Sequence, residues 1–283
     1  MILYLAGVNG DQFGNLANGL DILTTYWETR KWKDGKLGEF KRNHQFKRLF
    51  LDCGAYSAWS NGITIDIQKY CDYLKSNLDG MTEYPQLDVK GDFEATKANL
   101  AYMEAQGLHP MPVFHMTNMP IEYFKELVDK GYKRIAIGAV AGEKGNRSIM
   151  NDLKFQTIFS HIIDKETKVV KVKLHAFGVT GLATLLKYPF WSADSTSWLG
   201  GAKFGSINWF NQQTGKLEDG GTADAFLRAF HRLDAEHQAP SRSLARSGKN
   251  YLRRLALCRD AYVAAGAYAT KVWESRGFSF LED

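Results

Sequence analysis

Residues 111–138 of the chain read MPVFHMTNMPIEYFKELVDKGYKRIAIG. This stretch begins and ends with short apolar runs, Met111–His115 and Arg134–Gly138, which are typical of strands buried on both faces. Between them, Ile121–Lys130 has the pattern of a helix, and Gly131 follows at the usual stop position. The stretch therefore predicts a β-α-β unit with two parallel strands.

The same alternation continues on both sides of this unit. Six further runs have the composition of buried strands: Ile2–Ala6, Arg48–Asp52, Gln86–Val89, Val172–Phe177, Phe190–Asp194 and Gly205–Trp209. Three further stretches have a helical pattern: Ile65–Leu78, Glu94–Gln106 and Ser148–Ile163. Eight strands alternating with helices predict a single α/β domain, a (β/α)8 barrel of the TIM type. A doubly wound open sheet is the alternative, and the polar residues at so many strand ends favour the barrel.

The composition is that of an ordinary globular protein, with 45% hydrophobic and 24% charged residues among 283. No repeat or linker divides the sequence, so we expect one domain over residues 1–283. No apolar run reaches the roughly 18 residues of a membrane span, and the apolar start is too short for a signal peptide. We therefore expect a cytoplasmic protein. Its three cysteines are widely spaced, which argues against disulfides and zinc: Cys53, Cys71 and Cys258.

Two stretches are rich in basic residues, although the net charge of the chain is only +5. Residues 30–48 contain eight lysines and arginines against two acids. Ser241–Trp273 has the pattern of a long helix or helix pair, within a C-terminal segment over about residues 222–283 that we expect to pack on the barrel. One basic stripe recurs along it at helical spacing: Arg242, Arg246, Lys249 and Arg253. Four apolar residues would face the barrel: Leu244, Leu252, Leu255 and Val263. A solvated face explains any one stripe equally well, and the pair of basic stretches favours a nucleic-acid partner.

Carboxylates lie at or near the ends of three expected strands, namely Asp52, Asp88 and Asp194, and His115 and His175 lie at or near two more. In barrel enzymes the active site lies at the carboxyl ends of the strands. Each acid alone could cap the next helix. Three together suit glycosyl transfer, in which one carboxylate attacks the anomeric carbon and another moves protons, or a magnesium site.

At these positions the chain resembles a known family. Four segments occur in the order seen in the tRNA-guanine transglycosylases: Leu51–Tyr56, Ile137–Glu143, Phe177–Thr180 and Ala193–Ser195. The segments Met111–His115 and Tyr188–Trp198 look like the shorter phage and bacterial DpdA-type enzymes, which exchange guanine in DNA for a 7-deazaguanine base. The resemblance covers about residues 48–209. It implies a TIM-type barrel and a phage-encoded pentosyltransferase that works in the host cytoplasm without a cofactor.

The resemblance also implies roles for individual residues. Asp194 matches the nucleophile that bonds to the anomeric carbon of the sugar, and Asp52 matches the acid/base carboxylate. Asp88 matches the carboxylate that reads the edge of the base. Four further residues are expected in the substrate-binding site: Tyr56 as a candidate for stacking on the base, His115 where the tRNA enzymes have a glutamine, Gly138 where a backbone group touches the base, and His175.

One departure from the family is large. The tRNA enzymes carry a Cys-x-Cys-x-x-Cys plus His zinc site near the C-terminus, where this chain has only Cys258. We therefore expect no metal and no zinc subdomain, which favours DNA over tRNA as the polynucleotide, with a free base such as 7-cyano-7-deazaguanine as second substrate. Three alternatives stay open: a tRNA-guanine transglycosylase, a nucleic-acid-binding barrel without catalysis, and a magnesium-dependent hydrolase or phosphodiesterase that uses Asp52, Asp88 and Asp92.

Overall fold

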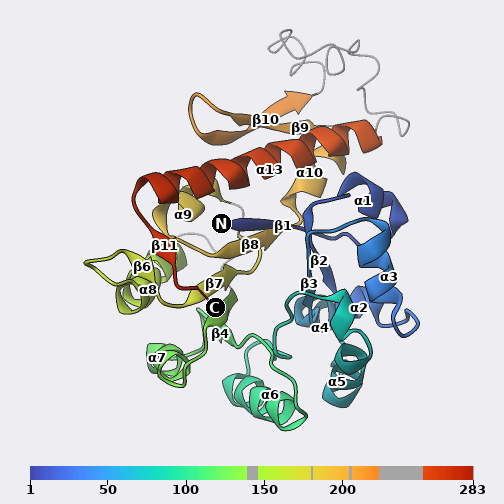
Figure 1. Cartoon of the computed structure of the whole chain (residues 1–283), viewed down its shortest axis with the longest axis vertical. Coiled ribbons are helices and arrows are strands. Elements are labelled where there is room, and N and C mark those ends of the chain that lie inside the picture. Colours follow the sequence, from blue (N-terminus) through green and yellow to red (C-terminus); the bar gives the residue numbers. More distant parts are fainter. Residues whose placement is uncertain (139–145, 180, 204–205, 223–250, 283) are drawn as a thin grey trace.

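The computed structural model describes residues 1–138, 146–179, 181–203, 206–222 and 251–282 (Figure 1). At its centre lies a curled, seven-stranded parallel sheet with the order β3-β2-β1-β8-β7-β5-β4. Its strands are β1 (Ile2–Ala6), β2 (Asp21–Thr25), β3 (Arg48–Asp52), β4 (Val113–His115), β5 (Arg134–Gly138), β7 (Lys173–Ala176) and β8 (Ser192–Ser195). The predicted α/β class with a parallel sheet is confirmed, as are six of the predicted strands.

The segment 82–86 lies between the two edge strands of this sheet and hydrogen-bonds to both sides. On the β3 side, the Leu51 N–H donates to the Glu83 carbonyl at 2.9 Å. On the β4 side, the Gln86 N–H donates to the carbonyl of Met111, also at 2.9 Å. The predicted regular strand over 86–89 is therefore wrong. A short irregular stretch takes its place in the fold, and it begins and ends three to four residues earlier in the sequence.

A second predicted strand has a different place in the fold. Gly205–Trp209 falls on β9 (Ser206–Asn211), which pairs antiparallel with β10 (Lys216–Thr222) in a separate hairpin. The eight-strand count therefore included β9 wrongly and missed β2. The missed strand reads Asp-Ile-Leu-Thr-Thr, and only two of its five residues are aliphatic, so its apolar signal is weak.

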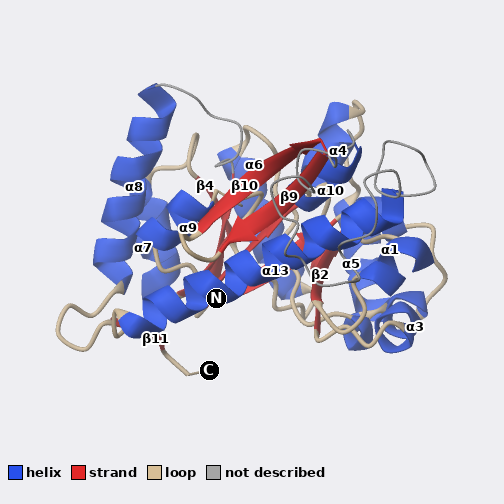
Figure 2. Ribbon diagram, turned by 90° about the horizontal axis from the view of Figure 1, so that it is seen from above, coloured by secondary structure: helices blue, strands red, loops and turns tan. Residues whose placement is uncertain are grey.

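Helices follow the strands and cover the outer face of the sheet (Figures 1 and 2). They are α1 (Asp11–Leu16), α2 (Tyr26–Thr29), α3 (Lys36–Asn43), α4 (Ala55–Ser60), α5 (Ile67–Ser76), α6 (Phe93–Ala105), α7 (Ile121–Asp129), α8 (Asn146–Ile162), α9 (Leu182–Lys187), α10 (Ser197–Lys203) and α13 (Tyr251–Ser275). A 3-10 turn, η1 (Leu78–Gly80), and a two-stranded pair, β6 (Val169–Val170) with β11 (Ser279–Phe280), complete the described elements. The four helices predicted between strands are confirmed to within two residues at each end: α5, α6, α7 and α8.

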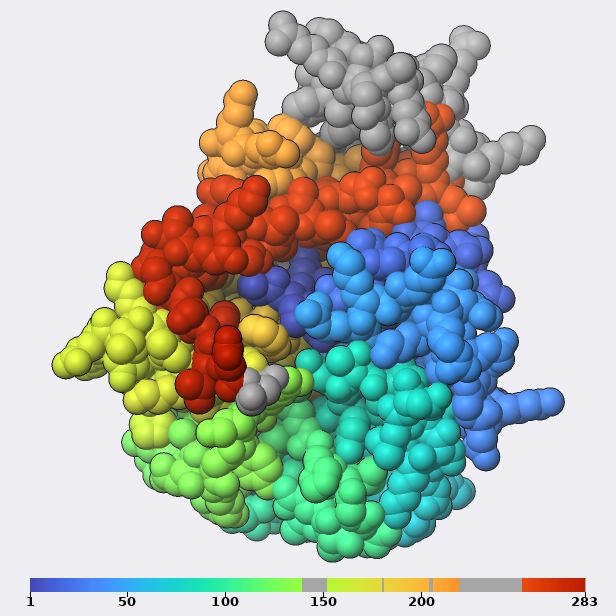
Figure 3. All heavy atoms as spheres, viewed as in Figure 1, coloured from blue at the N-terminus to red at the C-terminus, as the bar shows by residue number. Residues whose placement is uncertain are grey.

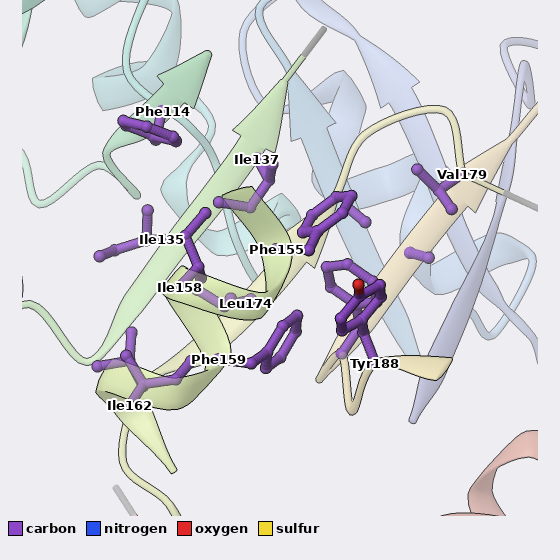
Figure 4. Close-up of a cluster of buried hydrophobic side chains, with 14 of the residues drawn as sticks. Phe114, Ile135, Ile137, Phe155, Ile158, Phe159, Ile162, Leu174, Val179 and Tyr188 are labelled. Carbon is purple, nitrogen blue, oxygen red and sulfur yellow. The ribbon is translucent and has the colours of Figure 1, made fainter. Parts of the chain in front are cut away.

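The apolar core lies in two layers, one on each face of the curled sheet. The inner layer is a small cluster: Tyr4, Ala6, Leu23, Phe50, Met111, Val113 and Ala136. The outer layer joins strands to helices, and Figure 4 shows Phe155, Ile158 and Phe159 of α8 packed near Ile137 and Leu174 of the sheet. Successive side chains of a strand alternate between the two faces. A polar residue two positions from an inner-layer residue therefore also faces inward.

The C-terminal helix α13 crosses the sheet-and-helix assembly and packs against α9, α10, β1 and the β9–β10 hairpin (Figures 2 and 3). Leu255 is buried as predicted, whereas Leu252 and Val263 are about 40% exposed and the prediction that they face the barrel is wrong. Among the basic residues of the predicted stripe, Arg253 lies on α13 and is partly buried. The others, and Leu244, lie outside the described residues. No helix in the described part of the chain is long and apolar enough to cross a membrane.

Candidate active site

The polar residues predicted from the strand ends lie at one end of the parallel sheet. Asp52, His115 and Gly138 are the last residues of β3, β4 and β5. His175 and Asp194 are the third residues of β7 and β8. All these strands run in the same direction, so their carboxyl ends share one edge. Asp88 joins them from the end of the segment 82–86, and the hydrogen bonds described below connect it to β4.

Asp52 sits in a turn that brings backbone N–H groups to its carboxyl. The Gly54 N–H donates to Asp52 Oδ2 at 3.0 Å. Gly54 has a left-handed backbone (φ +75°), and a Cβ there would lie 2.5 Å from the Cβ of Trp27, so the turn requires glycine. Burial, and then the negative charges of Asp88 and Asp194, raise the pKa of Asp52 to about 7. Near neutral pH this carboxyl is therefore present in both protonation states, as an acid/base group needs to be.

Asp88 is hydrogen-bonded through both of its oxygens. The Cys53 thiol donates to Oδ1 at 3.0 Å, and His115 Nε2 lies 2.8 Å from Oδ2. A carboxylate only accepts hydrogen bonds, so Nε2 carries the hydrogen of that contact. Burial raises the pKa of the Cys53 thiol, so the group stays protonated and can donate to Asp88. No sequence pattern marks this contact, which joins residues 35 positions apart.

Gly138 makes room for the ring of His115. A Cβ on Gly138 would lie 2.7 Å from His115 Cδ2 and 3.1 Å from Nε2, the atom that contacts Asp88. The close approach that glycine permits here is therefore to His115. Contact between a Gly138 backbone group and a base stays a prediction.

Gly138→Ala is expected to displace the His115 ring and break its hydrogen bond to Asp88. The backbone of Gly138 is not left-handed, so the added methyl acts through crowding alone and costs about 1–3 kcal/mol of stability. Urea denaturation measures that loss, and the affinity for the free base measures the displacement. Gly10→Ala is the matched control, because a Cβ at Gly10 meets no atom within 4 Å. Equal affinity for the base in both variants would contradict the prediction.

Asp194 is held by the backbone and backed by a buried histidine. The Gly178 N–H donates to Asp194 Oδ1 at 3.0 Å. His175 Nε2 lies 3.3 Å from the same oxygen, in an alignment that falls short of a hydrogen bond. Its Nδ1 contacts Ser192 Oγ at 2.8 Å, and its ring stacks on Phe50 at 4.6 Å. His175 is fully buried, and its direct contact with a substrate stays a prediction.

Tyr56 is exposed and is separate from the buried cluster of carboxylates and histidines. Its side chain is 70% exposed, on the first turn of α4 after Asp52. Trp59 of the same helix is also exposed, and the Lys90 ammonium lies 3.3 Å from the centroid of the Trp59 ring. A role of Tyr56 in stacking on the base stays a prediction.

Asp92 and Asp88, two of the carboxylates in the magnesium alternative, accept hydrogen bonds from the protein. Asp92 caps α6, since its Oδ1 accepts the Ala95 N–H at 2.9 Å. Asp88 is bonded to Cys53 and His115. In the part of the chain that the structure describes, no group of three or more His, Cys, Asp or Glu side chains is arranged to hold a metal ion.

The basic stretch 30–48 extends from one end of the sheet to the other. Arg30 follows α2, beyond the carboxyl end of β2, and its guanidinium lies 3.6 Å from the centroid of the Trp27 ring. Arg48 begins β3 at the opposite end and pairs with Asp21 at 3.2 Å. The stretch therefore does not form a single surface beside the carboxylates.

Comparison with known proteins gives little information about this chain. No protein-family model matches it, and neither does any curated protein. Among solved structures, it is similar to a protein of Coccidioides immitis provisionally assigned as a fructose-1,6-biphosphate aldolase, with 14% sequence identity and a TM-score of 0.45. The match covers 96% of this chain and 88% of the other. A shared activity does not follow from such a likeness.

Proposed function

We propose that the chain is a pentosyltransferase that exchanges guanine in a polynucleotide, DNA in preference to tRNA, for a 7-deazaguanine base. The observation that carries the proposal is the gathering of Asp52, Asp88 and Asp194, with the pKa of Asp52 raised to about 7 by burial and by the two other charges. We also propose that the sheet closes into a (β/α)8 barrel, with the segment 82–86 in the position of the eighth strand. This segment hydrogen-bonds to both edge strands of the seven-stranded sheet.

The proposed reaction is a double displacement at the anomeric carbon. A carboxylate oxygen of Asp194 forms a bond to C1′ of the sugar, the C1′–N9 bond to guanine breaks, and its electron pair leaves with the base. Protonated Asp52 gives its proton to the departing guanine. The incoming base then loses its N9 proton to Asp52, N9 bonds to C1′, and the C1′–oxygen bond to Asp194 breaks. Two inversions keep the original configuration of the sugar.

Asp88 is proposed to read the edge of the base. Its orientation is fixed by Cys53 and His115, and a fixed acceptor discriminates between bases better than a mobile one. In a duplex the target base must first leave the stack, which costs a few kcal/mol. The magnesium alternative has less support, because the Asp92 carboxyl caps α6.

One incubation separates the open readings. The protein is mixed with guanine-containing DNA, or with a tRNA transcript, and with radiolabelled guanine, in the presence and absence of EDTA. Label that enters the polynucleotide despite EDTA supports base exchange, and the DNA and tRNA arms identify the substrate. Metal-dependent cleavage without incorporation would support the hydrolase, and binding alone would support an inert barrel.

A further inference from the structure

The segment directly after Asp52 carries an exposed apolar face. Tyr56 and Trp59 of α4 are 70% and 53% exposed, and Ile63, just beyond the helix, is 48% exposed. Tyr56 and Trp59 are three positions apart on α4 and therefore lie on one side of the helix. Exposed aromatic rings grouped beside a cluster of carboxylates indicate an interaction surface.

Two cations lie over aromatic rings in this region. The Lys90 ammonium lies 3.3 Å from the ring centroid of Trp59, and the Arg30 guanidinium lies 3.6 Å from that of Trp27. In each pair a positive charge lies over one face of an aromatic ring. Glu28, an acid on the same helix as Trp27, is hydrogen-bonded to Asn9 at 2.9 Å.

The two pairs flank the Asp52 turn. Trp27 belongs to α2, which follows β2, and it lies against Gly54, where a Cβ would be 2.5 Å from its own Cβ. Lys90 follows the segment 82–86 and is two residues from Asp88. β3 pairs with β2 on one side and with that segment on the other. Figure 1 shows α2 and α4 next to each other, and the two helices are in contact.

We infer that these two cation–aromatic pairs, Trp27 with Arg30 and Trp59 with Lys90, form a rim that holds a strand of polynucleotide beside the carboxylates. The inference rests on the proposed function, and it names where the strand lies. Aromatic faces stack on unpaired bases and sugars, while the cations bind phosphates. A strand from which one base has been flipped exposes both kinds of group on either side of the gap. The rim would thus supply part of the electrostatic contact that was predicted for the two basic stretches, and Arg30 belongs to the first of them.

The test compares affinities for a fluorescein-labelled, guanine-containing oligonucleotide, single-stranded and duplex, by fluorescence anisotropy at several salt concentrations. Trp59→Ala is expected to weaken binding about tenfold, the loss of one stacking contact. Lys90→Ala is expected to lower the log–log salt slope by about 0.7 for the single strand or 0.9 for the duplex. Trp59→Phe and Lys90→Arg keep a ring and a charge and should restore most of the binding.

Matched controls come from the C-terminal ends of α6 and α7. Tyr102 lies near the C-terminal end of α6 and Lys130 just after α7. Both side chains are exposed, and both lie at the helix ends farther from the carboxylates. Tyr102→Ala and Lys130→Ala should bind the oligonucleotide as the unmodified protein does. Thermal melting of all variants checks that they fold.

The outcomes distinguish failure of the rim proposal from failure of the proposed base exchange. Unchanged affinity and salt slope in Trp59→Ala and Lys90→Ala overturn the rim, and so does an equal loss in the two control variants. An unmodified protein that binds neither oligonucleotide also overturns it. If binding depends on Trp59 and Lys90 while no base is exchanged, the rim stands and the transglycosylase is overturned. If both stand, the rim variants should raise KM for the polynucleotide and leave kcat unchanged.

Discussion

Asp194→Asn is expected to reduce base exchange by more than about a thousandfold while the protein still folds and binds polynucleotide. The substitution removes the anionic oxygen that would bond to C1′ and hardly changes the volume of the side chain. The amide keeps an oxygen that can accept the Gly178 N–H, now 3.0 Å from Oδ1, so the local backbone should persist. His175 and Phe50 pack behind the strand and are not altered.

Two measurements check this expectation. Incorporation of radiolabelled guanine measures exchange, and denaturing gel electrophoresis detects the covalent protein–polynucleotide adduct formed when no incoming base is present. Both should be lost in Asp194→Asn. Near-normal exchange in this variant, with loss of the adduct in Asp52→Asn or Asp88→Asn, would show that a different carboxylate is the nucleophile.

Asp92→Asn is the matched control for this substitution. Asp92 lies at the same end of the sheet, four residues after Asp88, but its carboxyl caps α6. Asparagine is an equally good cap, so stability and exchange should both remain near those of the unmodified protein. A large loss of activity in Asp92→Asn would instead favour the magnesium reading, in which Asp92 is a ligand.

The second large effect concerns pH. Protonated Asp52 is the proposed donor to the departing guanine, and its pKa is raised to about 7 by burial and by Asp88 and Asp194. Formation of the covalent adduct in a single turnover should therefore be fastest below pH 7 and fall about tenfold per unit above it. Asp52→Asn should form adduct slowly at every pH, without this fall. A profile for the unmodified protein that is flat between pH 6 and 8.5 would contradict the assignment.

The same group makes stability depend on pH. Because the pKa of Asp52 is higher in the folded protein than its ordinary value of 3.8, the folded state binds this proton more tightly. The free energy of unfolding should therefore decrease as pH rises from about 4 to about 7, and stay at the lower level above that. Asp52→Asn removes the free-energy cost of ionising this buried carboxyl above pH 7. It should stabilise the protein at pH 8 by about 2 kcal/mol, roughly half of the full linkage value because Asp52 is only partly buried. Urea denaturation at pH 5 and pH 8 measures the difference.

The parallel sheet could be predicted from the sequence because most of its strands are dense in aliphatic residues. Arg134–Gly138 and the helix before it matched the structure to within a residue. β2 was missed because two threonines and an aspartate make up most of it, and the burial of Thr24 depends on tertiary packing. β9 was misplaced because its apolar residues pack on α13, and composition does not say which layer an apolar face will meet.

The positions of Asp52, Asp88 and Asp194 at the carboxyl ends followed from the alternation of strands and helices. Their supporting contacts did not. His115 binds Asp88 across 27 residues, and Gly178 reaches Asp194 through a backbone N–H that no side-chain pattern marks. The roles of Gly138 and His175 became visible only once the rings packed around them were in place.

The irregular segment 82–86 has a consequence for how the sheet opens. Its hydrogen bonds to β3 and β4 are fewer than those of a continuous ladder, whereas β1 and β8 pair in register over four residues. Local opening begins where the backbone ladder is thinnest, so amide hydrogens along this seam should exchange with solvent before those of β1 and β8. Asp88 follows the seam directly. The carboxylate assigned to reading the base therefore lies beside a part of the sheet that should open before β1 and β8, and in the closed state Cys53 and His115 hold its orientation.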